Sequence, residues 1–248
     1  MTLSAVIITY NAVVRLESCL ASLAFADEVL VVDSSSSDGT IALAERHRAR
    51  VVQKEWLGFG PQKQFAVEAA SHDWVLCIDA DERVSDHLRA SILEAIAAPR
   101  SGAYAMARCN RFLGRWLKHG EGYPDWSLRL FDRRHARWSD DGVHEKVMTA
   151  QPVLRLRGDL LHDSAETLDR YLEKQNRYTS LQAEQLNRRG GRASAWRLVL
   201  SPLLRFIKFY FFRLGFLDGV PGLIHVSIGC MNSFNKYAKL MALQRPAP

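Results

Sequence analysis

The first half of the chain alternates short apolar runs with stretches of helical periodicity. Three of these runs have the length of strands and lack polar alternation, which is typical of strands buried on both faces. They span residues 3–9, 28–32 and 74–78. Leu16, Leu20 and Leu23 lie at helical spacing and predict a helix over residues 14–23. Strands that alternate with helices at this spacing indicate an α/β fold with a Rossmann-like, mostly parallel sheet.

The rest of the chain has a weaker pattern. Further helices are predicted over residues 41–46, 61–70, 85–97 and 167–187, and further strands over residues 51–52 and 103–109. Residues 110–145 are rich in Gly, Trp, His and Arg and show no long period. Such a loop-rich insert beside a sheet edge often carries the residues that bind a substrate, such as the acceptor of a transferred group. We therefore predict an α/β domain over residues 1–165 and a helical, basic region over residues 166–248.

Three carboxylates follow the third buried strand directly. Asp79, Asp81 and Glu82 stand at its carboxyl end, where open α/β sheets bind ligands. Residues i and i+2 of an extended chain point the same way, so Asp79 and Asp81 are expected to aim at one point. Two hard oxygen ligands suit Mg²⁺ or Mn²⁺, which takes its other ligands from water and a substrate phosphate. A surface turn with three solvated acids is the alternative.

A fourth carboxylate, Asp33, ends the second strand. Because this strand end opens on the same edge as Asp79, Asp33 can hydrogen-bond a base or a ribose while the acidic pair holds a metal on the phosphates. A lone Asp in this place is more often a helix cap. Gly58 and Gly60 fit neither a Walker loop nor a Gly-x-Gly-x-x-Gly loop, so a metal has to carry most of the diphosphate charge.

Charge is distributed unevenly along the 248 residues, whose formal net charge is +6. Residues 1–150 hold 18 Lys and Arg against 20 Asp and Glu, whereas residues 151–248 hold 15 against 7. From Leu186 onwards there are ten basic residues and one acid, Asp218. This asymmetry predicts a C-terminal face that meets an anionic partner, either nucleic acid or a membrane surface.

The segment 203–217 favours a membrane as that partner. On a helix its three cations fall in one sector about 140° wide, opposite an aliphatic and aromatic face, as in helices that lie in a membrane interface. A core helix whose cations reach the surface is the alternative. The apolar stretch 223–231 is too short to span a bilayer and is a candidate for a second dipping segment. No uncharged apolar stretch reaches 18 residues.

Four motifs in chain order carry a family resemblance. They are Ser4-Ala5-Val6-Ile7-Ile8-Thr9-Tyr10-Asn11, Val31-Val32-Asp33-Ser34, Asp38-Gly39-Thr40 and Ile78-Asp79-Ala80-Asp81-Glu82. Over about residues 3–145 the chain resembles family 2 glycosyltransferases of the GT-A fold. The resemblance implies an inverting transfer from a nucleoside-diphosphate sugar, most often UDP-linked. It further implies a nucleoside pocket and a bound Mg²⁺ or Mn²⁺. The residues implied are Thr9, Tyr10, Asn11 and Asp33 for the pocket, and Asp79 and Asp81 for the metal.

A second set of motifs carries a narrower resemblance. They are Gln62-Lys63-Gln64, Gly120 with Tyr123-Pro124-Asp125, Arg129-Leu130-Phe131, Val143-His144-Glu145, and Asp218-Gly219 with Phe234-Asn235-Lys236-Tyr237. They resemble bacterial lipopolysaccharide inner-core β-glucosyltransferases, which implies UDP-glucose as donor, a lipid-linked saccharide as acceptor and no nucleic acid. Together with the basic, amphipathic segment 203–217, a lipid-linked acceptor predicts a peripheral protein on the cytoplasmic face of the inner membrane. Lys63, Ala80 and Arg129 are then expected beside the donor, although Arg129 also fits a structural ion pair.

The transfer needs a base for the acceptor hydroxyl as well as a Lewis acid on the leaving diphosphate. The candidate carboxylates beyond the sheet edge are Asp125, Asp140, Asp141 and Glu145. Family 2 enzymes usually place an acid pair here, and Val143-His144-Glu145 fits that position with His144 in place of the first acid. Glu145 is therefore the predicted base, with a surface ion pair as its alternative. His162 is the predicted third metal ligand, with a core or capped histidine as its alternative.

Other classes fit the sequence less well. Four isolated cysteines argue against a zinc site and against a disulfide framework. A nucleotidyltransferase is expected to carry a Gly-rich loop after the first strand, and Thr9-Tyr10-Asn11 is not one. A nucleic-acid-binding protein explains the basic tail and predicts salt-sensitive binding to any polyanion. A non-catalytic sugar-nucleotide sensor needs Asp33 but not Glu145.

Overall fold

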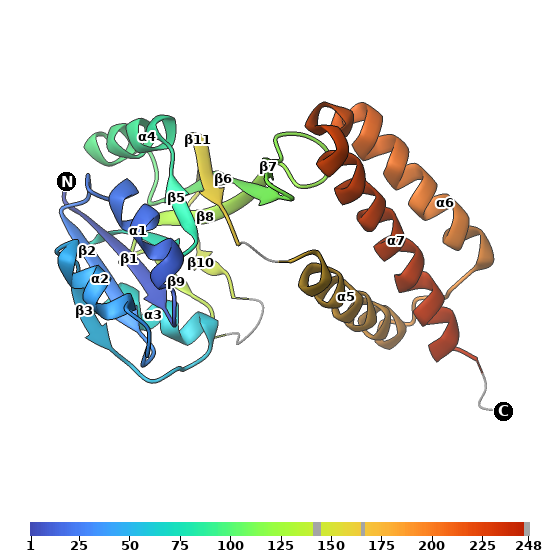
Figure 1. Ribbon diagram of the computed structural model, residues 1–248, viewed down its shortest axis with the longest axis horizontal. Coiled ribbons are helices and arrows are strands. Elements are labelled where there is room, and N and C mark those ends of the chain that lie inside the picture. The colour runs from blue at the N-terminus through green and yellow to red at the C-terminus, as the bar shows by residue number, and fades with distance from the viewer. Residues whose placement is uncertain (141–144, 165–166, 246–248) are drawn as a thin grey trace. The chain divides into compact units, whose positions relative to one another are not determined.

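The computed structural model describes residues 1–140, 145–164 and 167–245 (Figure 1). The chain divides into two compact units, which are described separately. The first unit contains Met1–Arg108 and Asp125–Asp163, and the second contains Cys109–Pro124 and Ser164–Pro248. Residues 109–124 thus group with the C-terminal helices, whereas the predicted boundary at residue 165 leaves them in the first domain.

A mixed sheet forms the centre of the first unit. Its first half is parallel, in the order β3 (Arg50–Gln53), β2 (Glu28–Asp33), β1 (Leu3–Thr9) and β4 (Trp74–Asp79). The sheet continues with β8 (Asp125–Asp132), β6 (Ala103–Phe112), β11 (Val153–His162) and β5 (Glu82–Val84). Strand β8 runs antiparallel to β4 and to β6, and β5 runs antiparallel to β11. The predicted α/β class, with a parallel N-terminal half, is confirmed.

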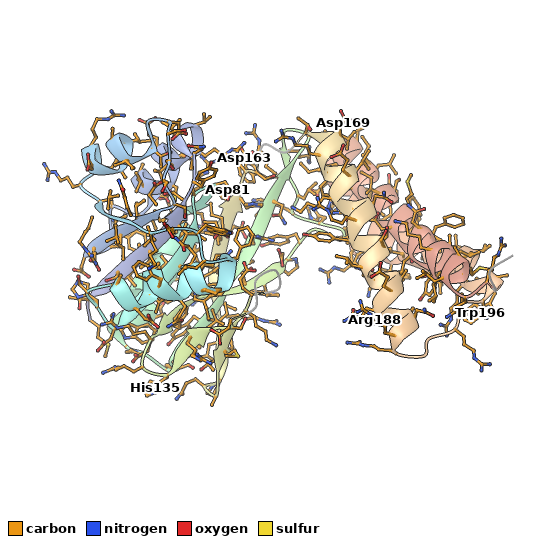
Figure 2. All side chains as sticks on the ribbon, turned by 90° about the horizontal axis from the view of Figure 1, so that it is seen from below. Asp81, His135, Asp163, Asp169, Arg188 and Trp196 are labelled. Atoms are coloured by element: carbon orange, nitrogen blue, oxygen red, sulfur yellow. The ribbon has the colours of Figure 1, made fainter. Side chains whose placement is uncertain are left out.

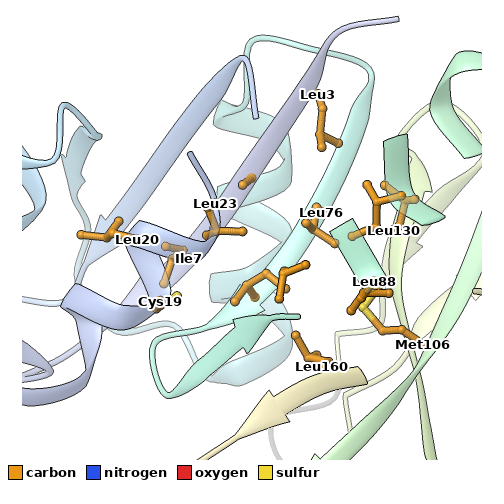
Figure 3. Packing of buried hydrophobic residues seen from close by; sticks show 14 of the residues in the cluster. Leu3, Ile7, Cys19, Leu20, Leu23, Leu76, Leu88, Met106, Leu130 and Leu160 are labelled. Atoms are coloured by element: carbon orange, nitrogen blue, oxygen red, sulfur yellow. The ribbon is translucent and has the colours of Figure 1, made fainter. Parts of the chain in front are cut away.

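Helices cover both faces of this sheet. One face packs against α1 (Val13–Ser22), α2 (Thr40–Arg46) and α4 (Asp86–Ala97), and the other against α3 (Phe59–Ala69). The alternation of side chains along β1 divides them between two cores, because Ala5 and Ile7 join the first cluster and Val6 the second. Figure 3 shows the first cluster, where Ile7 lies with Leu20 of α1 and with Leu23, which follows that helix.

The chain changes faces between β2 and β4. The connections through α1 and α2 lie on one face and the connection through α3 lies on the other, so β4 returns on the opposite side of β1 from β2. The carboxyl ends of β1 and β4 are therefore neighbours at a topological switch point, and Ile8 is in register with Asp79. Open α/β sheets bind their ligands in the crevice outside such a point.

The prediction of a loop-rich insert over residues 110–145 is wrong for its central part. Residues 125–132 form β8, an interior strand between β4 and β6. Its sequence looks polar because Arg129, in the middle of the strand, is buried and paired with carboxylates of the first unit. Two short strands follow, β9 (Ala136–Trp138) and β10 (Val147–Thr149), which pair with each other.

The second unit is a helical assembly that holds the segment 109–124. Its elements are β7 (Arg115–Trp116), α5 (Leu168–Arg188), α6 (Ala195–Phe206), the π-helix η1 (Ile207–Phe212), the 3₁₀-helix η2 (Gly215–Asp218) and α7 (Gly219–Leu243). The buried carboxylate of Asp218 accepts hydrogen bonds from the backbone N–H groups of Lys118 (3.0 Å) and His119 (2.9 Å). Arg115 donates to the carbonyl of Leu217 at 2.8 Å. These contacts anchor residues 109–124 on the turn before α7.

The predicted continuous helix over residues 203–217 is wrong. Regular helix ends at Phe206, and the chain passes through a π-helical turn to Leu214, which has a left-handed φ of 55°. Gly215 follows because a Cβ there would lie 2.6 Å from the carbonyl oxygen of Phe209. The apolar stretch 223–231 lies inside α7 rather than forming a separate segment. Within the described residues no single helix is long and apolar enough to cross a membrane.

Candidate functional site

Asp79, the last residue of β4, forms ion pairs with two cationic side chains. Its Oδ2 lies 2.7 Å from Nη2 of Arg129 on β8, and its Oδ1 lies 3.1 Å from Nζ of Lys63 on α3. Neighbouring side chains of a strand point to opposite faces of the sheet, and Ile78 packs on the α1 side. The side chain of Asp79 therefore points to the α3 side, where it reaches Lys63 and Arg129. Burial favours the neutral acid, but the charges of Arg129 and Lys63 outweigh it and hold the pKa of Asp79 well below its usual value. Asp79 is therefore ionised in the working range of pH.

Lys63 joins this carboxylate to the predicted base. Its Nζ lies 3.1 Å from Oε1 of Glu145 as well as from Asp79. The ammonium also lies 4.9 Å from the ring centroid of Trp138 on β9, and the Lys63 side chain is almost fully buried. One cation thus holds the carboxylates of Asp79 and Glu145 on the same side of the sheet edge.

Glu82 fixes the turn that follows Asp79. Its Oε2 accepts the backbone N–H of Asp79 at 2.9 Å, and its Oε1 lies 3.1 Å from Nη2 of Arg129. Burial raises the pKa of Glu82 above its usual value, although the charge of Arg129 opposes this. Burial alone would lower the pKa of Arg129, but Asp79 and Glu82 raise it overall. Nη1 of Arg129 is buried and has no hydrogen-bond partner among the residues that the structure describes.

Replacement of Arg129 by Met is expected to lower the free energy of unfolding by about 3–5 kcal/mol, because two buried carboxylates lose their shared partner. Urea unfolding at neutral pH measures this loss. Arg137→Met is the matched control, since Arg137 and Asp140 are both exposed and lie 3.9 Å apart, so the loss of this ion pair is expected to cost less than about 1 kcal/mol. Equal losses in the two variants would show that the Arg129 pair is not desolvated.

Asp81 and His162 are brought together by the pairing of β5 with β11. His162 is in register with Glu82, which places its Nε2 3.3 Å from Oδ2 of Asp81. The backbone N–H of Asp163 donates to the carbonyl of Asp81 at 3.0 Å, and Figure 2 shows Asp81 and Asp163 close together. Burial favours the neutral form of Asp81, but the hydrogen bond from His162 outweighs it and lowers the pKa of Asp81. A charged carboxylate beside an imidazole at a strand end fits a divalent cation that takes its other ligands from a diphosphate and water.

The three predicted metal ligands do not form one cluster. Asp81 and His162 lie together, but Asp79 contacts Lys63 and Arg129 instead. In the parts of the chain that the structure describes, no group of three His, Cys, Asp or Glu side chains is arranged to hold a metal. The chain turns at Ala80 and Asp81, so the two aspartates do not share an extended strand and the i, i+2 expectation fails.

The predicted nucleoside-binding residues lie at the ends of β1 and β2. Thr9 Oγ1 donates to Oδ2 of the fully buried Asp33 at 2.9 Å, and the backbone N–H of Ser36 donates to Oδ1 at 2.8 Å. Asn11 has a left-handed φ of 48° and accepts from the backbone of Ser37 at 2.9 Å. Tyr10 is 65% exposed. Asp33 thus organises the 33–37 turn, and the exposed Tyr10 lies in sequence between Thr9 and Asn11, which both bond to this turn.

The other candidate bases differ in their surroundings. Oδ2 of Asp125 lies 2.7 Å from Nη2 of Arg108, and the exposed Asp140 lies 3.9 Å from Nη2 of Arg137. Asp141 and His144 lie outside the described residues. Glu145 is the candidate that an ammonium joins to Asp79 at the end of β4.

Sequence patterns did not indicate Trp138 and Arg108 as residues of this site, nor the contact that Glu82 makes. Trp138 packs beside Lys63 and Arg129, Arg108 pairs with Asp125, and Glu82 supports the backbone of Asp79. The signal for Glu82 was present, since an acid three residues after Asp79 can close a turn onto its N–H. Trp138 and Arg108 carry no local signal, because they reach the site through the folding of β9 and of β6.

Comparisons with known proteins agree with this geometry. Residues 4–155 match the family described as Glycosyl transferase family 2. The chain is 32% identical to the lipopolysaccharide core biosynthesis glycosyltransferase LpsC of Rhizobium meliloti, over 97% of this chain and 92% of LpsC. It is 30% identical to an uncharacterized glycosyltransferase of Rickettsia felis, over 96% of this chain and 89% of that protein.

Solved structures show the same fold at low sequence identity. The mannosyltransferase PcManGT of Pyrobaculum calidifontis, in complex with GDP-Man and Mn²⁺, is 17% identical, with a TM-score of 0.53 over 97% of this chain and 85% of that one. S. aureus TarS 1–349 in complex with UDP-GlcNAc is 16% identical, with a TM-score of 0.51 over 98% of this chain and 92% of that one. The expected GT-A fold is confirmed, and the chain belongs to glycosyl transferase family 2.

Proposed function

We propose that this glycosyltransferase transfers a sugar from a UDP-sugar to a lipid-linked saccharide with inversion at the anomeric carbon. The observation that carries the proposal is the gathering of Asp79, Asp81 and Glu145 around the end of β4, with Lys63 joining two of them. An inverting transfer is one in-line displacement, and it needs a base for the acceptor and stabilisation of the leaving diphosphate. This strand end offers a carboxylate for the first task and charged groups for the second.

On the donor side, Asp33 and Thr9 shape the nucleoside pocket, with Tyr10 and Asn11 at its rim. Asp81 and His162 would hold Mg²⁺ or Mn²⁺, which when bound supplies positive charge to the departing diphosphate. Asp79, together with Ala80, stands beside the donor as part of the same turn. The PcManGT structure contains Mn²⁺ with GDP-Man, which supports a cation at this kind of site.

On the acceptor side, Glu145 accepts the proton of the attacking hydroxyl. The ion pair with Lys63 holds its carboxylate in place and keeps it close to Asp79. The buried Nη1–H of the Arg129 guanidinium has no partner in the described parts of the chain and is proposed to donate to a phosphate oxygen. The residues of this chain therefore bind, orient and deprotonate, and no covalent intermediate with the protein is needed.

The acceptor is proposed to be a heptose of the lipopolysaccharide inner core, and the sugar to be glucose. The name of the R. meliloti relative, a lipopolysaccharide core biosynthesis glycosyltransferase, supports this acceptor class. Another cell-envelope glycan or a polyprenyl-phosphate acceptor is the second candidate. We place the protein peripherally on the cytoplasmic face of the bacterial inner membrane, where it would meet both the donor and a lipid-linked acceptor.

Asp33→Ala is expected to weaken UDP binding by about 10–100-fold, because a hydrogen bond to a charged group contributes about 1.5–3 kcal/mol. Isothermal titration with UDP, GDP and UDP-glucose in Mn²⁺ measures the affinity, and mass spectrometry of slow UDP-glucose hydrolysis reports turnover. Ser36→Ala is the matched control, because it removes one hydrogen bond to Asp33 but keeps the carboxylate.

Three outcomes separate the readings of this experiment. If the Asp33→Ala protein is less stable but binds UDP with unchanged affinity, Asp33 stabilises the 33–37 turn and does not contact the nucleoside. Tighter binding of GDP than of UDP by the wild type would overturn the proposed donor. UDP-glucose binding without hydrolysis, and without transfer to isolated inner-core lipopolysaccharide, would favour a sugar-nucleotide sensor.

A further inference from the structure

The outward face of α6 is apolar along its whole length. Five of its side chains and the residue that follows it are 36–67% exposed, and at 100° per residue they fall in one sector about 140° wide. These residues, here called the apolar stripe, are Trp196, Val199, Leu200, Leu203, Leu204 and Ile207. Trp196, labelled in Figure 2, lies at the start of α6. Past the helix, the bend carries two further exposed rings, Phe211 (54%) and Phe212 (80%).

Two polar side chains of α6, those of Ser201 and Arg205, point the other way, into the second unit. Ser201 Oγ lies 2.6 Å from Ser233 Oγ on α7, and Arg205 Nε donates to Glu121 Oε2 at 2.9 Å. Helices on a protein surface normally bury their apolar side and expose their polar side. Helix α6 does the reverse, and a continuous exposed apolar surface of this kind marks an interaction site.

Cations flank the stripe, and the sequence around it is poor in acids. Arg197 stacks 5.5 Å from the Trp196 ring centroid, Lys208 lies 5.2 Å from that of Phe209, and Lys236 lies 4.6 Å from that of Tyr237. Asp218 is the single acid from Leu186 onwards, and it is 2% exposed. Aromatic rings beside Lys and Arg, around an aliphatic face, match the chemistry of a bilayer interface that contains anionic headgroups.

We propose that the apolar stripe and the bend at Phe211 and Phe212 insert into one leaflet of a membrane that contains anionic lipid. The segments 195–212 and 215–243 are bent by 73° relative to each other, and only the pair together has the length and composition of a span. A bent pair with its most exposed ring, Phe212, at the bend dips into a leaflet with this ring deepest. A second copy of this chain fits less well, because a two-fold contact would set the basic flanks against each other.

Vesicle sedimentation of the full chain, without donor or metal, tests this binding independently of the proposed transfer. The protein is expected to sediment with vesicles of phosphatidylcholine and phosphatidylglycerol, and much less with phosphatidylcholine alone. The double variant Phe211→Ser and Phe212→Ser is expected to bind at least about tenfold more weakly. The matched control, Leu93→Ser with Val153→Ser, replaces two exposed apolar residues of the first unit and should bind as the wild type does.

A second variant and a second measurement keep the test decisive. Lys208→Glu leaves the apolar stripe intact and is expected to reduce the preference for phosphatidylglycerol, because it reverses one flanking charge. The proposal would be overturned if the wild-type protein sedimented with neither kind of vesicle. A concentration-dependent dimer, detected by light scattering and abolished by the double Phe variant, would instead assign the stripe to a second copy.

Discussion

Asp81→Asn is expected to abolish sugar transfer, with a loss of at least about 10³-fold in kcat/KM, because it removes the charged ligand of the proposed cation site. Asn keeps the size of the side chain, so the turn after β4 should remain folded. The hydrogen bond from His162 lowers the pKa of Asp81 despite its burial, so the wild-type carboxylate is charged at neutral pH. Initial rates with UDP-glucose over a Mn²⁺ titration measure the effect.

The controls for this variant separate the lost charge from a general defect. Asp86→Asn removes an exposed acid from the first turn of α4, five positions further along, and should leave the rates unchanged. His162→Ala should raise the Mn²⁺ concentration needed for half-maximal rate. Full wild-type activity in excess chelator, or an Asp81→Asn rate within about threefold of the wild-type rate, would remove the metal from the proposal.

The parallel half of the fold could be predicted from the sequence because its strands are buried on both faces. Residues of β1, β2 and β4 form uninterrupted apolar runs, and each run has the length of a strand. Strand β8 gave no such signal, since the buried Arg129 interrupts it and is stabilised by Asp79, fifty positions away in the chain. Local patterns record burial against apolar neighbours, but they do not record burial of a charge against a distant partner.

The same limit applies to the candidate site. Its position followed from the sequence, because Asp33 and Asp79 end two strands of one parallel sheet. The side-chain contacts inside the site could not be predicted from the sequence. Asp81 contacts His162 because β5 pairs with β11, and Asp79 contacts Lys63 of α3. In this structure an ammonium and a guanidinium occupy the carboxylate oxygens of Asp79 that the sequence assigned to a metal.

The C-terminal region shows why an amphipathic pattern does not reveal which side faces outwards. The sequence places Arg205 and Lys208 among the cations of one helix, which predicts that both are solvated. Arg205 instead points inwards and pairs with Glu121, 84 positions away, whereas Lys208 remains exposed. The inward direction of Arg205 is what leaves the apolar stripe outside.

Glu145→Gln is expected to lower kcat by about 10²–10⁴-fold, because the acceptor hydroxyl loses the group that takes its proton. The UDP affinity should remain near that of the wild type, since the nucleoside pocket at Thr9 and Asp33 is separate from this side chain. Single-turnover rates with UDP-glucose and an inner-core acceptor, together with UDP titrations, measure the two quantities. Asp140→Asn is the matched control, because Asp140 is an exposed acid five positions earlier whose pairing with Arg137 is loose, at 3.9 Å.

The role of Lys63 sharpens this last test. If Lys63 positions the Glu145 carboxylate through their 3.1 Å contact, Lys63→Met should also lower kcat, but Lys63→Arg should recover part of it by restoring a cation. Normal turnover of Glu145→Gln would transfer the role of base to Asp125, Asp140 or Asp141, and Asn variants at these positions would identify which. A fall in UDP affinity equal to the fall in kcat would show that Glu145 supports donor binding rather than the proton transfer, because the loss would then already be present in the ground state.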